Sequence, residues 1–404
     1  MSLSRRSFLG AAAAAGLAGA RLPAAAPTSS LPDAIPADRF DPWVEVDPQA
    51  LLRNVETVGR LSGGRPVLAV VKNNAYGLEL EVASKLLEPL PSIAGFAVVK
   101  PSSALALRHA GVRKPVLLMG MATDEESSEL ARRDVRLSVY TDDDARRMAA
   151  VRRVTGKPVD VHVYVDTGLG RMGIPYHRAL PWLETLVAAG DVSVEGTFTT
   201  FTEETDFDPE QLDRFLALGR QAGARGITLG RLHAASSNAV FHLPDAHLDL
   251  VRPGIALYGA YPSRPEEERA KAELVPAFRL RTRVVRVERL RPGDGVSYGR
   301  NYVAERPVWT ATLPVGHADG YPRRAVEGAR VLIGEGLHPV IGAVSASHAI
   351  VELGDETTVR VGDVATLVGP DHPDIHPNAI AAATGVSVYD ILMHLSPELP
   401  RVVV

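Results

Sequence analysis

Short apolar runs alternate with amphipathic stretches between residues 67 and 257, and this alternation limits the fold more than any other feature of the chain. The runs are rich in β-branched residues and are bounded by Gly, Pro and polar residues, which is typical of strands buried in a parallel sheet. Each run has the length of a strand. Strands are expected at 67–71, 95–99, 116–119, 136–140, 159–165, 192–198, 230–233 and 254–257.

The stretches between these runs have the spacing of helices. Strands that alternate with helices in this number, within about 200 residues, are the repeat of a (β/α)₈ barrel, and an open doubly wound sheet usually needs fewer strands. We therefore expect a TIM-like (β/α)₈ barrel over residues 43–275, which begins with a strand at 43–46 and a helix that Asp47 caps and Pro48 starts. Helices are expected at 79–87, 102–109, 142–154, 178–189 and 209–222.

The pattern of apolar runs changes after Pro276. Strand-like runs now follow one another with tight turns between them, such as PGDG at 292–295. We expect a mostly β domain over residues 276–404, and we expect the apolar segments 386–395 and 402–404 to pack against it. Its strands are expected at 278–290, 308–315, 330–333, 340–344, 349–353 and 357–368.

The composition excludes several classes of protein. A length of 404 residues exceeds the usual size of one core and agrees with two domains. The formal net charge is −4 and no basic stripe is present, so nucleic acid is not an expected partner. The absence of cysteine excludes disulfides and Cys-ligated zinc. His372 and His376 come nearest to a metal-ligand spacing but lie in a Pro/Asp-rich stretch, and no structural metal is expected.

The N-terminus resembles a bacterial export signal. Arg5 and Arg6 directly precede a run of Ala, Gly and Leu that reaches Ala20, which is the layout of a twin-arginine signal. The run is too short to anchor a folded protein in a membrane, and the Pro/Ala/Ser-rich stretch after it is typical of a linker. We expect residues 1–37 to be an export signal and linker, and the protein to be periplasmic or secreted, with no membrane anchor after export.

Lys72 stands at the end of the apolar run 67–71 and four residues before Tyr76. A buried strand that delivers a lysine into a turn holds the amine against apolar walls, where loss of water lowers the pKa of the ammonium group. The free amine is then available as a nucleophile or base, which is the chemistry of Schiff-base lysines. For this position taken alone, an ordinary exposed lysine is the alternative.

Residues just past the carboxyl ends of barrel strands line the active site, and the loops after strands seven and eight commonly bind phosphate. Arg171 follows the fifth expected strand, His233 and Ser237 lie at the seventh, and Arg252 and Gly254 lie at the eighth. Small and hydroxyl residues suit a phosphate site because backbone N–H groups must approach its oxygens closely. A lysine opposite a phosphate site indicates pyridoxal 5'-phosphate (PLP).

Five sequence blocks, spread over nearly the whole chain after residue 43, resemble in order the motifs of the alanine racemase family. The resemblance implies a barrel followed by a β domain, PLP as cofactor, a small amino acid as substrate and a homodimer that shares its active sites. It also implies racemisation, with alanine as the default substrate. The blocks are VKNNAYG (71–77), VDTGLGRMG (165–173), LHAASS (232–237), VRPGIALYG (251–259) and GHADGYPR (316–323).

The resemblance also implies the roles of single residues. Lys72 corresponds to the lysine that holds PLP as an internal aldimine and serves as the base for the D face of the substrate. Arg252 corresponds to the arginine at the pyridine nitrogen; because arginine stays protonated, it donates a hydrogen bond there without handing over a proton. Arg171 corresponds to the residue near the substrate carboxylate, and His233 to a residue beside the pyridine ring. The implied phosphate ligands are Tyr76, Ser237, Gly254 and Ile255.

The last block departs from the family at a catalytic position. The family motif is Gly-Tyr-Ala-Asp-Gly, and its tyrosine is the acid/base group for the L face of the substrate. His317 occupies that position. Histidine has an ordinary pKa of about 6.5 against about 10 for tyrosine, so His317 can exchange a proton near neutral pH if it reaches the substrate. The alternative is a loop histidine in a site that has lost racemase function.

Further positions depart as well. Thr200 stands where the family usually has a histidine that supports the ring-side arginine, and Tyr164 replaces a lysine that is often found two residues before the Asp-Thr-Gly motif. Ser236 replaces an asparagine, and Ala346 and Ser347 replace a Met-Asp pair near the substrate entrance. We expect cofactor binding to survive these changes, whereas the substrate and the second base are less constrained.

Three functions agree with this pattern. The first is an exported, PLP-dependent amino-acid racemase that is alanine racemase-like, with room for broader specificity. The second is another PLP reaction on the same scaffold, such as stereospecific aldol cleavage, elimination or decarboxylation, for which one base suffices. The third is a catalytically silent PLP-binding protein. Interconversion of enantiomers separates the first from the other two.

Overall fold

The computed structural model describes residues 39–404. The expected export signal and linker, residues 1–37, lie outside the described residues. Both expected domains fall within the described range. In that range no helix combines the length and the apolar composition that crossing a bilayer requires.

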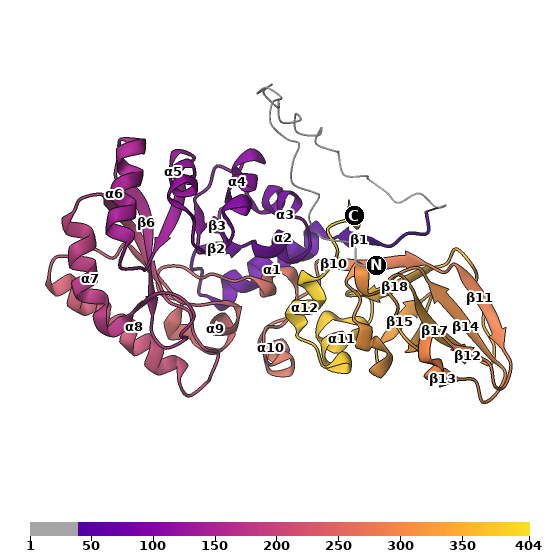
Figure 1. Cartoon of the computed structure of the whole chain (residues 1–404). Coiled ribbons are helices and arrows are strands. Elements are labelled where there is room, and N and C mark those ends of the chain that lie inside the picture. The colour runs from indigo at the N-terminus through magenta and orange to yellow at the C-terminus, as the bar shows by residue number, and fades with distance from the viewer. Residues whose placement is uncertain (1–38) are drawn as a thin grey trace, which may run out of the picture. The chain divides into compact units, whose positions relative to one another are not determined.

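A parallel sheet forms the core of the first part of the chain, coloured indigo to pink in Figure 1. Its strands follow the order of the sequence, which confirms the expected repeat of strands and helices. All residues of Val67–Val70 are buried, because both faces of this strand are covered. The strands are β2 (Val67–Val70), β3 (Ile93–Val98), β4 (Val116–Leu118), β5 (Val135–Val139), β6 (Val159–Asp166), β8 (Val192–Phe198) and β9 (Arg231–His233), with β7 (Ile174–Pro175) paired to β6.

The segment expected as the eighth strand, 254–257, does not form a strand. Ile255–Tyr258 form a short 3₁₀ helix, η2, instead. Residues 249–253 take the strand's place between β9 and β2, where main-chain hydrogen bonds join them to Leu232 at 3.0 Å and to Leu68 at 2.8 Å. A short apolar run indicates burial but does not separate a strand from a buried helical turn, which explains the error.

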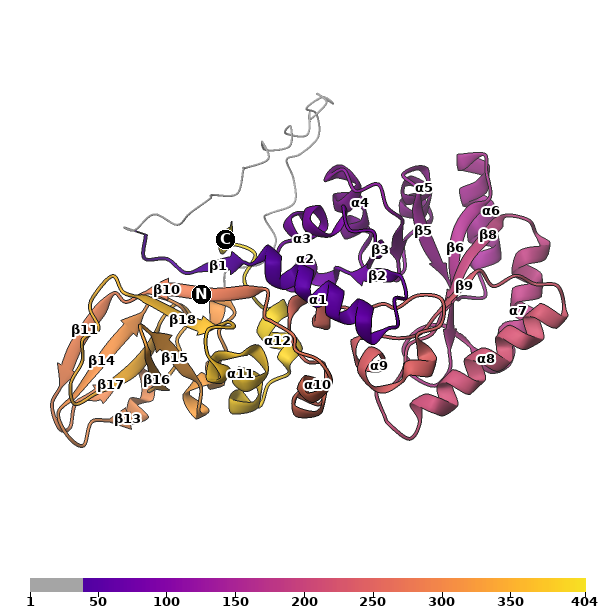
Figure 2. The same cartoon turned by 180° about the vertical axis from the view of Figure 1, so that it is seen from behind.

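Helices alternate with the strands, as can be followed from both sides in Figures 1 and 2. The first begins where expected, because the carboxylate of Asp47 accepts a hydrogen bond from the amide of Ala50 at 3.0 Å and Pro48 takes the first position. The helices are α1 (Pro48–Leu61), α2 (Lys72–Tyr76), α3 (Leu80–Leu87), α4 (Pro101–His109), α5 (Asp124–Arg132), α6 (Asp144–Thr155), α7 (Tyr176–Ala188), α8 (Asp208–Ala224), α9 (Ser237–His242) and α10 (Pro265–Lys271).

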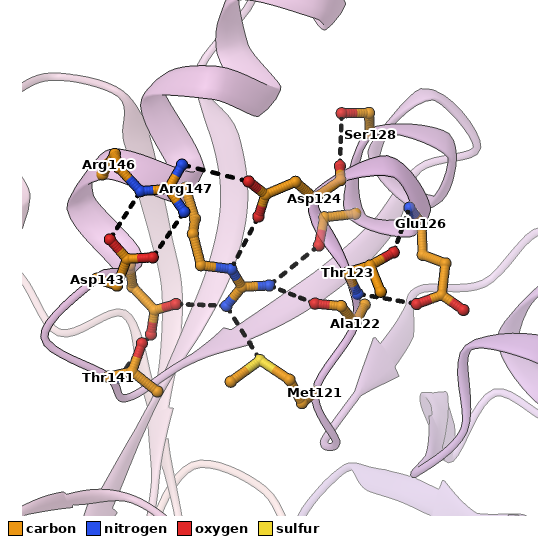
Figure 3. Close-up of polar contacts among 12 residues, drawn as sticks. Met121, Ala122, Thr123, Asp124, Glu126, Ser128, Thr141, Asp143, Arg146 and Arg147 are labelled. Atoms are coloured by element: carbon orange, nitrogen blue, oxygen red, sulfur yellow. Dashed lines mark hydrogen bonds and ion pairs between the residues drawn. The ribbon is translucent and has the colours of Figure 1, made fainter.

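A buried arginine links the loops that follow β4 and β5 (Figure 3). Arg147 of α6 donates to the main-chain oxygen of Ala122 at 2.5 Å and to the carboxylate of Asp144 at 2.6 Å. The same carboxylate accepts from the amide of Tyr140 at 2.6 Å. Tyr140 in turn packs edge-on against Tyr164, with ring centroids 5.9 Å apart. These hydrogen bonds therefore fix the loop after β5, and Tyr140 of that loop packs against Tyr164, which replaces the family's lysine.

The second part of the chain is mostly β, as expected, and is orange to yellow in Figure 1. Its large sheet has the strand order β11-β14-β17-β16-β15-β18-β10-β1-β19. The strand β1 (Trp43–Val46) precedes the barrel in the chain, yet it pairs here with β10 and with β19. The other strands are β10 (Phe278–Arg283), β11 (Arg286–Leu290), β14 (Val308–Leu313), β15 (Arg330–Ile333), β16 (Gly336–Ile341), β17 (Ala349–Gly354), β18 (Val364–Val368) and β19 (Arg401–Val403), and β12 (Gly295–Val296) pairs with β13 (Tyr302–Val303).

Some of the expected β segments differ from the observed elements. The segment 278–290 is two strands, because its first half pairs with β18 and its second half with β14. The segment 357–368 is a strand only from Val364 onward. The apolar segment 386–395 contains a helix, α12 (Val388–Met393), which follows α11 (Pro377–Thr384). Apolar character indicated burial in each case, whereas the partner strands decided the boundaries.

Candidate active site

A cavity of about 280 Å³ lies at the carboxyl ends of the parallel strands. Lys72 and Arg171 follow β2 and β6, so side chains that barrel geometry places at this end do meet. A larger cavity of about 430 Å³ in the β domain contains no residue of the five sequence blocks. The smaller cavity is lined by Val70, Lys72, Tyr76, Met119, Arg171, Thr200, Glu203, Ser236, Ser237, Arg252, Gly254 and Tyr389.

Lys72 begins a left-handed turn. Residues 73–76 all have φ between 51° and 56°, and Gly77 ends the turn with φ 87°. Left-handed backbone costs roughly 1–2 kcal/mol for each residue that is not glycine. Such strain persists only where the surroundings hold it, and it gathers at functional sites. The turn brings Tyr76 next to the amine, with Nζ of Lys72 6.0 Å from the ring centroid.

The C-terminal part of the chain holds this turn in place. The buried Arg401 donates to the main-chain oxygen of Gly77 through Nε at 3.1 Å and Nη2 at 2.6 Å. A Cβ atom at Gly77 would lie 2.3 Å from the main-chain oxygen of Leu392, so only glycine permits this approach of α12. The position of the Lys72 amine therefore depends on a contact that spans 324 positions of sequence.

The surroundings of Lys72 favour the free amine. Burial lowers the pKa of its ammonium group, the Arg171 guanidinium lowers it further, and the Glu203 carboxylate opposes both by raising it. The net direction is downward. A larger share of the amine is then unprotonated near neutral pH, as a nucleophile or base requires.

Two backbone amides converge on one oxygen atom at the cavity wall. The hydroxyl of Ser237 accepts hydrogen bonds from the amides of Gly254 at 2.9 Å and Ala256 at 3.3 Å. A Cβ atom at Gly254 would lie 2.1 Å from the hydroxyl of Tyr76, so only glycine allows that hydroxyl to reach the same place. Tyr76 stacks on Tyr258 with centroids 4.7 Å apart, and burial raises its pKa. Amide and hydroxyl donors gathered in this way suit the oxygens of a phosphate group.

Arg252 is buried and is held by acceptors of the protein. Nη1 donates to the main-chain oxygen of His233 at 2.7 Å and to Nδ1 of the same residue at 3.0 Å, and Nη2 donates to the main-chain oxygen of Thr199 at 2.6 Å. Burial lowers the pKa of the guanidinium to about 10, so the group stays charged at neutral pH. The guanidinium carbon lies 5.1 Å from the ring centroid of Phe198. Arg252 is thus a fixed, charged donor at the cavity wall.

His233 lies behind Arg252 and not at the cavity surface, where the resemblance puts a residue beside the cofactor ring. Its side chain is fully buried, and both ring nitrogens are engaged, Nδ1 by Arg252 and Nε2 by His162 at 2.9 Å. No ring nitrogen is left for a cofactor. Arg252 thereby has a histidine partner although position 200 is a threonine.

Arg171 and its loop are organised by Asp166, whose carboxylate accepts hydrogen bonds from the amides of Gly168 at 2.9 Å and Gly170 at 3.2 Å. The two glycines have positive φ, 145° and 68°, which lets the loop turn tightly after β6. The guanidinium of Arg171 brings a positive charge to the side of the cavity that also holds Lys72.

Glu203 brings a negative charge to the cavity, and sequence reasoning missed it. Its backbone is left-handed, with φ 68°, and its amide donates to the carboxylate of Asp208 at 3.1 Å. Burial raises the pKa of the Glu203 carboxyl, while the Ser236 hydroxyl and the Lys72 ammonium lower it. Glu203 belongs to none of the sequence blocks, and its strained backbone is visible only in the structure.

Two departures from the family pattern contact each other. The hydroxyl of Tyr164 donates to Oγ1 of Thr200 at 3.2 Å. The ring of Tyr164 stacks on Phe198, with centroids 4.3 Å apart, and Phe198 also underlies Arg252. The two replacements therefore form one packed unit beside the ring-side arginine.

Tyr389 of α12 was also missed by sequence reasoning. Its ring lies 6.3 Å from that of Tyr76, and burial raises the pKa of its hydroxyl, which remains a donor. The only sequence signal is a tyrosine within the apolar segment 386–395, and nothing in that segment indicates a contact with residue 76.

His317 lies outside the cavity of its own chain. It starts a 3₁₀ helix, η4 (His317–Asp319), is exposed, and its amide donates to the main-chain oxygen of Ser345 at 3.0 Å. Its neighbour Ala318 bonds in the same way to Ala346 at 2.9 Å. The positions 317 and 346, which both depart from the family pattern, thus lie together, away from Lys72.

Comparisons with known proteins identify the family. The family model described as alanine racemase, N-terminal domain, matches residues 46–262, and the one described as alanine racemase, C-terminal domain, matches residues 277–403. The chain belongs to the alanine racemase family. The alanine racemase of Desulforamulus reducens is 33% identical over 89% of this chain and 98% of its own length. That of Carboxydothermus hydrogenoformans is 34% identical over 90% of this chain and 99% of its own.

Solved structures agree with this result. The crystal structure of alanine racemase from Streptomyces lavendulae has a TM-score of 0.85 at 29% identity, and the match covers 91% of this chain and 97% of that one. Alanine racemase from Streptomyces coelicolor has a TM-score of 0.83 at 30% identity, over 90% and 98% of the two chains. The fold expected from the sequence, a barrel-like domain followed by a mostly β domain, is confirmed.

Alanine racemases depend on PLP, and the cavity fits this group. The amine of Lys72 would bind its aldehyde, and Arg252, which lines the same cavity, would donate to its pyridine nitrogen. The hydroxyls of Tyr76 and Ser237 would hold the phosphate together with the main chain of Gly254, at a place that a Cβ atom at Gly254 would fill. Ile255 is fully buried, so its main chain alone is suited to the predicted role of phosphate ligand.

Proposed function

We propose that the protein is an amino-acid racemase that uses PLP to interconvert the enantiomers of alanine. One observation carries this conclusion. A lysine whose pKa is lowered by burial shares a cavity with the phosphate-type cradle at Ser237 and with the buried cation of Arg252. Membership of the alanine racemase family supports the same assignment.

Five of the residues that line the cavity have distinct roles in this reaction. PLP, when bound, supplies the electron sink that makes the Cα–H bond of an attached amino acid acidic. Lys72 takes a proton at Nζ from one face of Cα, or returns it there. Arg171 offers its guanidinium to the substrate carboxylate, and Arg252 donates to the pyridine nitrogen while keeping its own proton. Tyr76 and Tyr389 hold the buried side of the cavity against water.

His317 is the proposed acid/base group for the other face of Cα, supplied by a second copy of the chain in a homodimer. Two observations support this. His317 is exposed and lies outside the cavity of its own chain, and it occupies the position of the family's second acid/base residue. Imidazole is a side-chain group that can both take up and release a proton near neutral pH.

Mixing two inactive variants tests the shared site. Lys72→Ala and His317→Ala chains are each expected to be inactive. After co-refolding in equal amounts, about half of the dimers are mixed, and each mixed dimer has one site with both groups intact, so about a quarter of wild-type activity should return. If dimers shown to be mixed recover no activity, either Lys72 and His317 act from the same chain or His317 is not the second acid/base group.

Alanine is proposed as the substrate from membership of the family. Glu203 and Ser236 add polar groups to the cavity wall, which can contact substrate side chains more polar than that of alanine. The test is to incubate the purified protein with single enantiomers of a panel of amino acids and to follow the appearance of the other enantiomer. If no amino acid is interconverted, the proposal fails.

A one-base PLP reaction is the second candidate. The replacement of the family's tyrosine by His317 favours it, because Lys72 is then the one base of the family pattern that the chain keeps. Deuterium from solvent that enters Cα without loss of enantiomeric purity would support this candidate. Exchange with racemisation would decide for the racemase.

Export through a twin-arginine signal is proposed from residues 1–37 alone. Arg5 and Arg6 are the residues that such a signal requires. Replacing both with lysine in the full chain should retain the protein inside the cell, as measured by fractionation of a bacterial host. Equal distribution of the wild type and the variant would overturn the proposal.

A further inference from the structure

A chain of hydrogen bonds leads from Arg252 through His233 to His162, which lies outside the catalytic cavity. Arg252 Nη1 is 3.0 Å from His233 Nδ1, and His233 Nε2 is 2.9 Å from His162 Nδ1. The exposed fraction of the side chain is 0% for His233 and 8% for His162. Beyond them, His162 lines a second cavity of about 240 Å³ near the amino ends of the strands.

The direction of these bonds follows from the chemistry of the donors. Arginine carries only N–H donors, so Nδ1 of His233 must accept. A neutral imidazole has one ring proton, which is then on Nε2 of His233 and is donated to Nδ1 of His162. Burial lowers the pKa of both histidines, that of His162 to about 3, so both rings are neutral at physiological pH. The proton of His162 is therefore on Nε2, and every donor points away from Arg252.

The backbone is adapted to the ring of His162. The pairing of β6 with β8 shifts register between Val161 and His162, and a shift of this kind re-aims the side chain that follows it. Gly196 is the partner of His162 on β8, and a Cβ atom there would lie 2.6 Å from Cε1 of the ring. Glycine on the neighbouring strand thus makes the room that the imidazole occupies.

Arg252 depends on this support. Among the hydrogen bonds of residues 39–404, His233 Nδ1 is the only side-chain acceptor of the guanidinium, and the remaining acceptors are main-chain oxygens. If His162 could not accept, the buried Nε2–H of His233 would lose its partner, and the ring would be free to turn. A turned ring would present a donor or a carbon to Arg252.

We propose that His162 is a positioning residue: it accepts a hydrogen bond from His233 and so fixes His233 Nδ1 as the acceptor that holds Arg252 at the cavity wall. This rests on the proposed cofactor site only for the role of Arg252 toward PLP. The histidine pair itself is a property of the protein without cofactor. The charged groups that face His162 are Arg136, Glu195 and Arg231, and Arg136 is paired with Glu195 at 2.7 Å.

The first test is ¹⁵N NMR of histidine-labelled protein without PLP. The signals of His162 and His233, assigned by substitution, should each show an unprotonated Nδ1 and a protonated Nε2, unchanged between about pH 5.5 and pH 9. A protonated Nδ1 on His233 would overturn the proposal. Because this readout needs neither cofactor nor turnover, it stands apart from the proposed function.

The second test compares three variants. His162→Leu removes the acceptor at similar size, His162→Gln keeps an acceptor, and His247→Leu is a matched control at another buried histidine, 6% exposed. We expect His162→Leu to change the His233 signals and to lower kcat roughly tenfold with little change in KM, and His162→Gln to recover most of the loss. His247→Leu should leave both readouts unchanged.

Each outcome decides between the proposals. Wild-type signals and kcat in His162→Leu would overturn the positioning role. If that variant does not fold, the NMR result on the wild type and the kcat of His162→Gln decide instead. A kcat of His162→Gln that is roughly tenfold lower than that of the wild type would then contradict the role of acceptor. A wild-type protein with the expected signals but no racemase activity would refute the proposed function and leave the histidine chain intact.

Discussion

The two walls of the cavity are built in different ways. The motif wall, formed by Lys72, Tyr76, Ser237 and Gly254, depends on backbone amides, glycines and a strained turn. The divergent wall, formed by Thr200, Glu203 and Ser236 with Tyr164 bonded to Thr200, depends on side chains that contact each other in pairs. Backbone sites tolerate little change because a single Cβ atom blocks them, whereas contacting side chains can be replaced together. The motif wall is therefore fixed, and the divergent wall is free to vary.

The largest expected effect is at Lys72. Lys72→Ala should abolish the absorbance band near 420 nm that PLP gives with a lysine amine, together with all activity. Borohydride reduction followed by peptide mapping checks the assignment, because the reduced adduct must lie on residue 72. A band or an adduct that survives in the variant would remove the basis for treating the motif wall as the cofactor end.

A methyl group on the motif wall is expected to have the next largest effect. Gly254→Ala places a Cβ atom 2.1 Å from the hydroxyl of Tyr76, which is packed against Tyr258 and cannot withdraw. Overpacking of this kind costs about 1–3 kcal/mol, so PLP should bind roughly 10–100-fold more weakly. Gly59→Ala, where a Cβ atom meets nothing within 4 Å, is the control in a PLP titration. Equal affinities in the two variants would contradict the comparison.

A change of charge on the divergent wall should act on the motif wall through the electrostatic field. Glu203 raises the pKa of Lys72, so Glu203→Gln should lower that pKa. The amine is free above its pKa, and the pH midpoint for PLP binding to the protein should therefore move to lower pH. Glu204→Gln, at the exposed neighbouring carboxylate, should not move it. A midpoint that rises, or that shifts equally in both variants, would refute the coupling.

The smallest expected effect is within the divergent wall. Tyr164→Phe removes the hydrogen bond to Thr200 but keeps the stack on Phe198, so it should cost about 1 kcal/mol of unfolding free energy in urea titration. In a double-mutant cycle with Thr200→Val, most of this cost should appear as coupling between the two sites. Strictly additive costs would show that the two replacements are independent of each other.

The sequence predicted the motif wall well because its chemistry is local. Lys72 at the end of an apolar run and Ser237 and Gly254 at neighbouring strands belong to short blocks, and barrel geometry brings strand ends together whatever the loops contain. The divergent wall left no such signal. Glu203 enters the cavity because its backbone is left-handed, and Tyr389 enters because α12 packs against the turn after Lys72.

The error at the eighth strand and the position of His233 have a common cause. In both segments the apolar sequence indicated burial. The groups that bond to each segment come from other parts of the chain and could not be predicted from it. Residues 249–253 form the closing segment because β2 and β9 both bond to them, and His233 faces inward because Arg252 and His162 engage its two nitrogens.

The amino-acid sequence alone determined the order of strands and helices, the division into a barrel and a β domain, and the lysine, tyrosine, serine and glycine that make the motif wall. The tertiary structure decided which strands pair across the chain, as with β1 and β19, which carboxylate enters the cavity, and that His317 stays outside it. Periodicity and turn chemistry act over a few residues and are written in the sequence. Contacts between residues hundreds of positions apart depend on packing, and no local pattern records them.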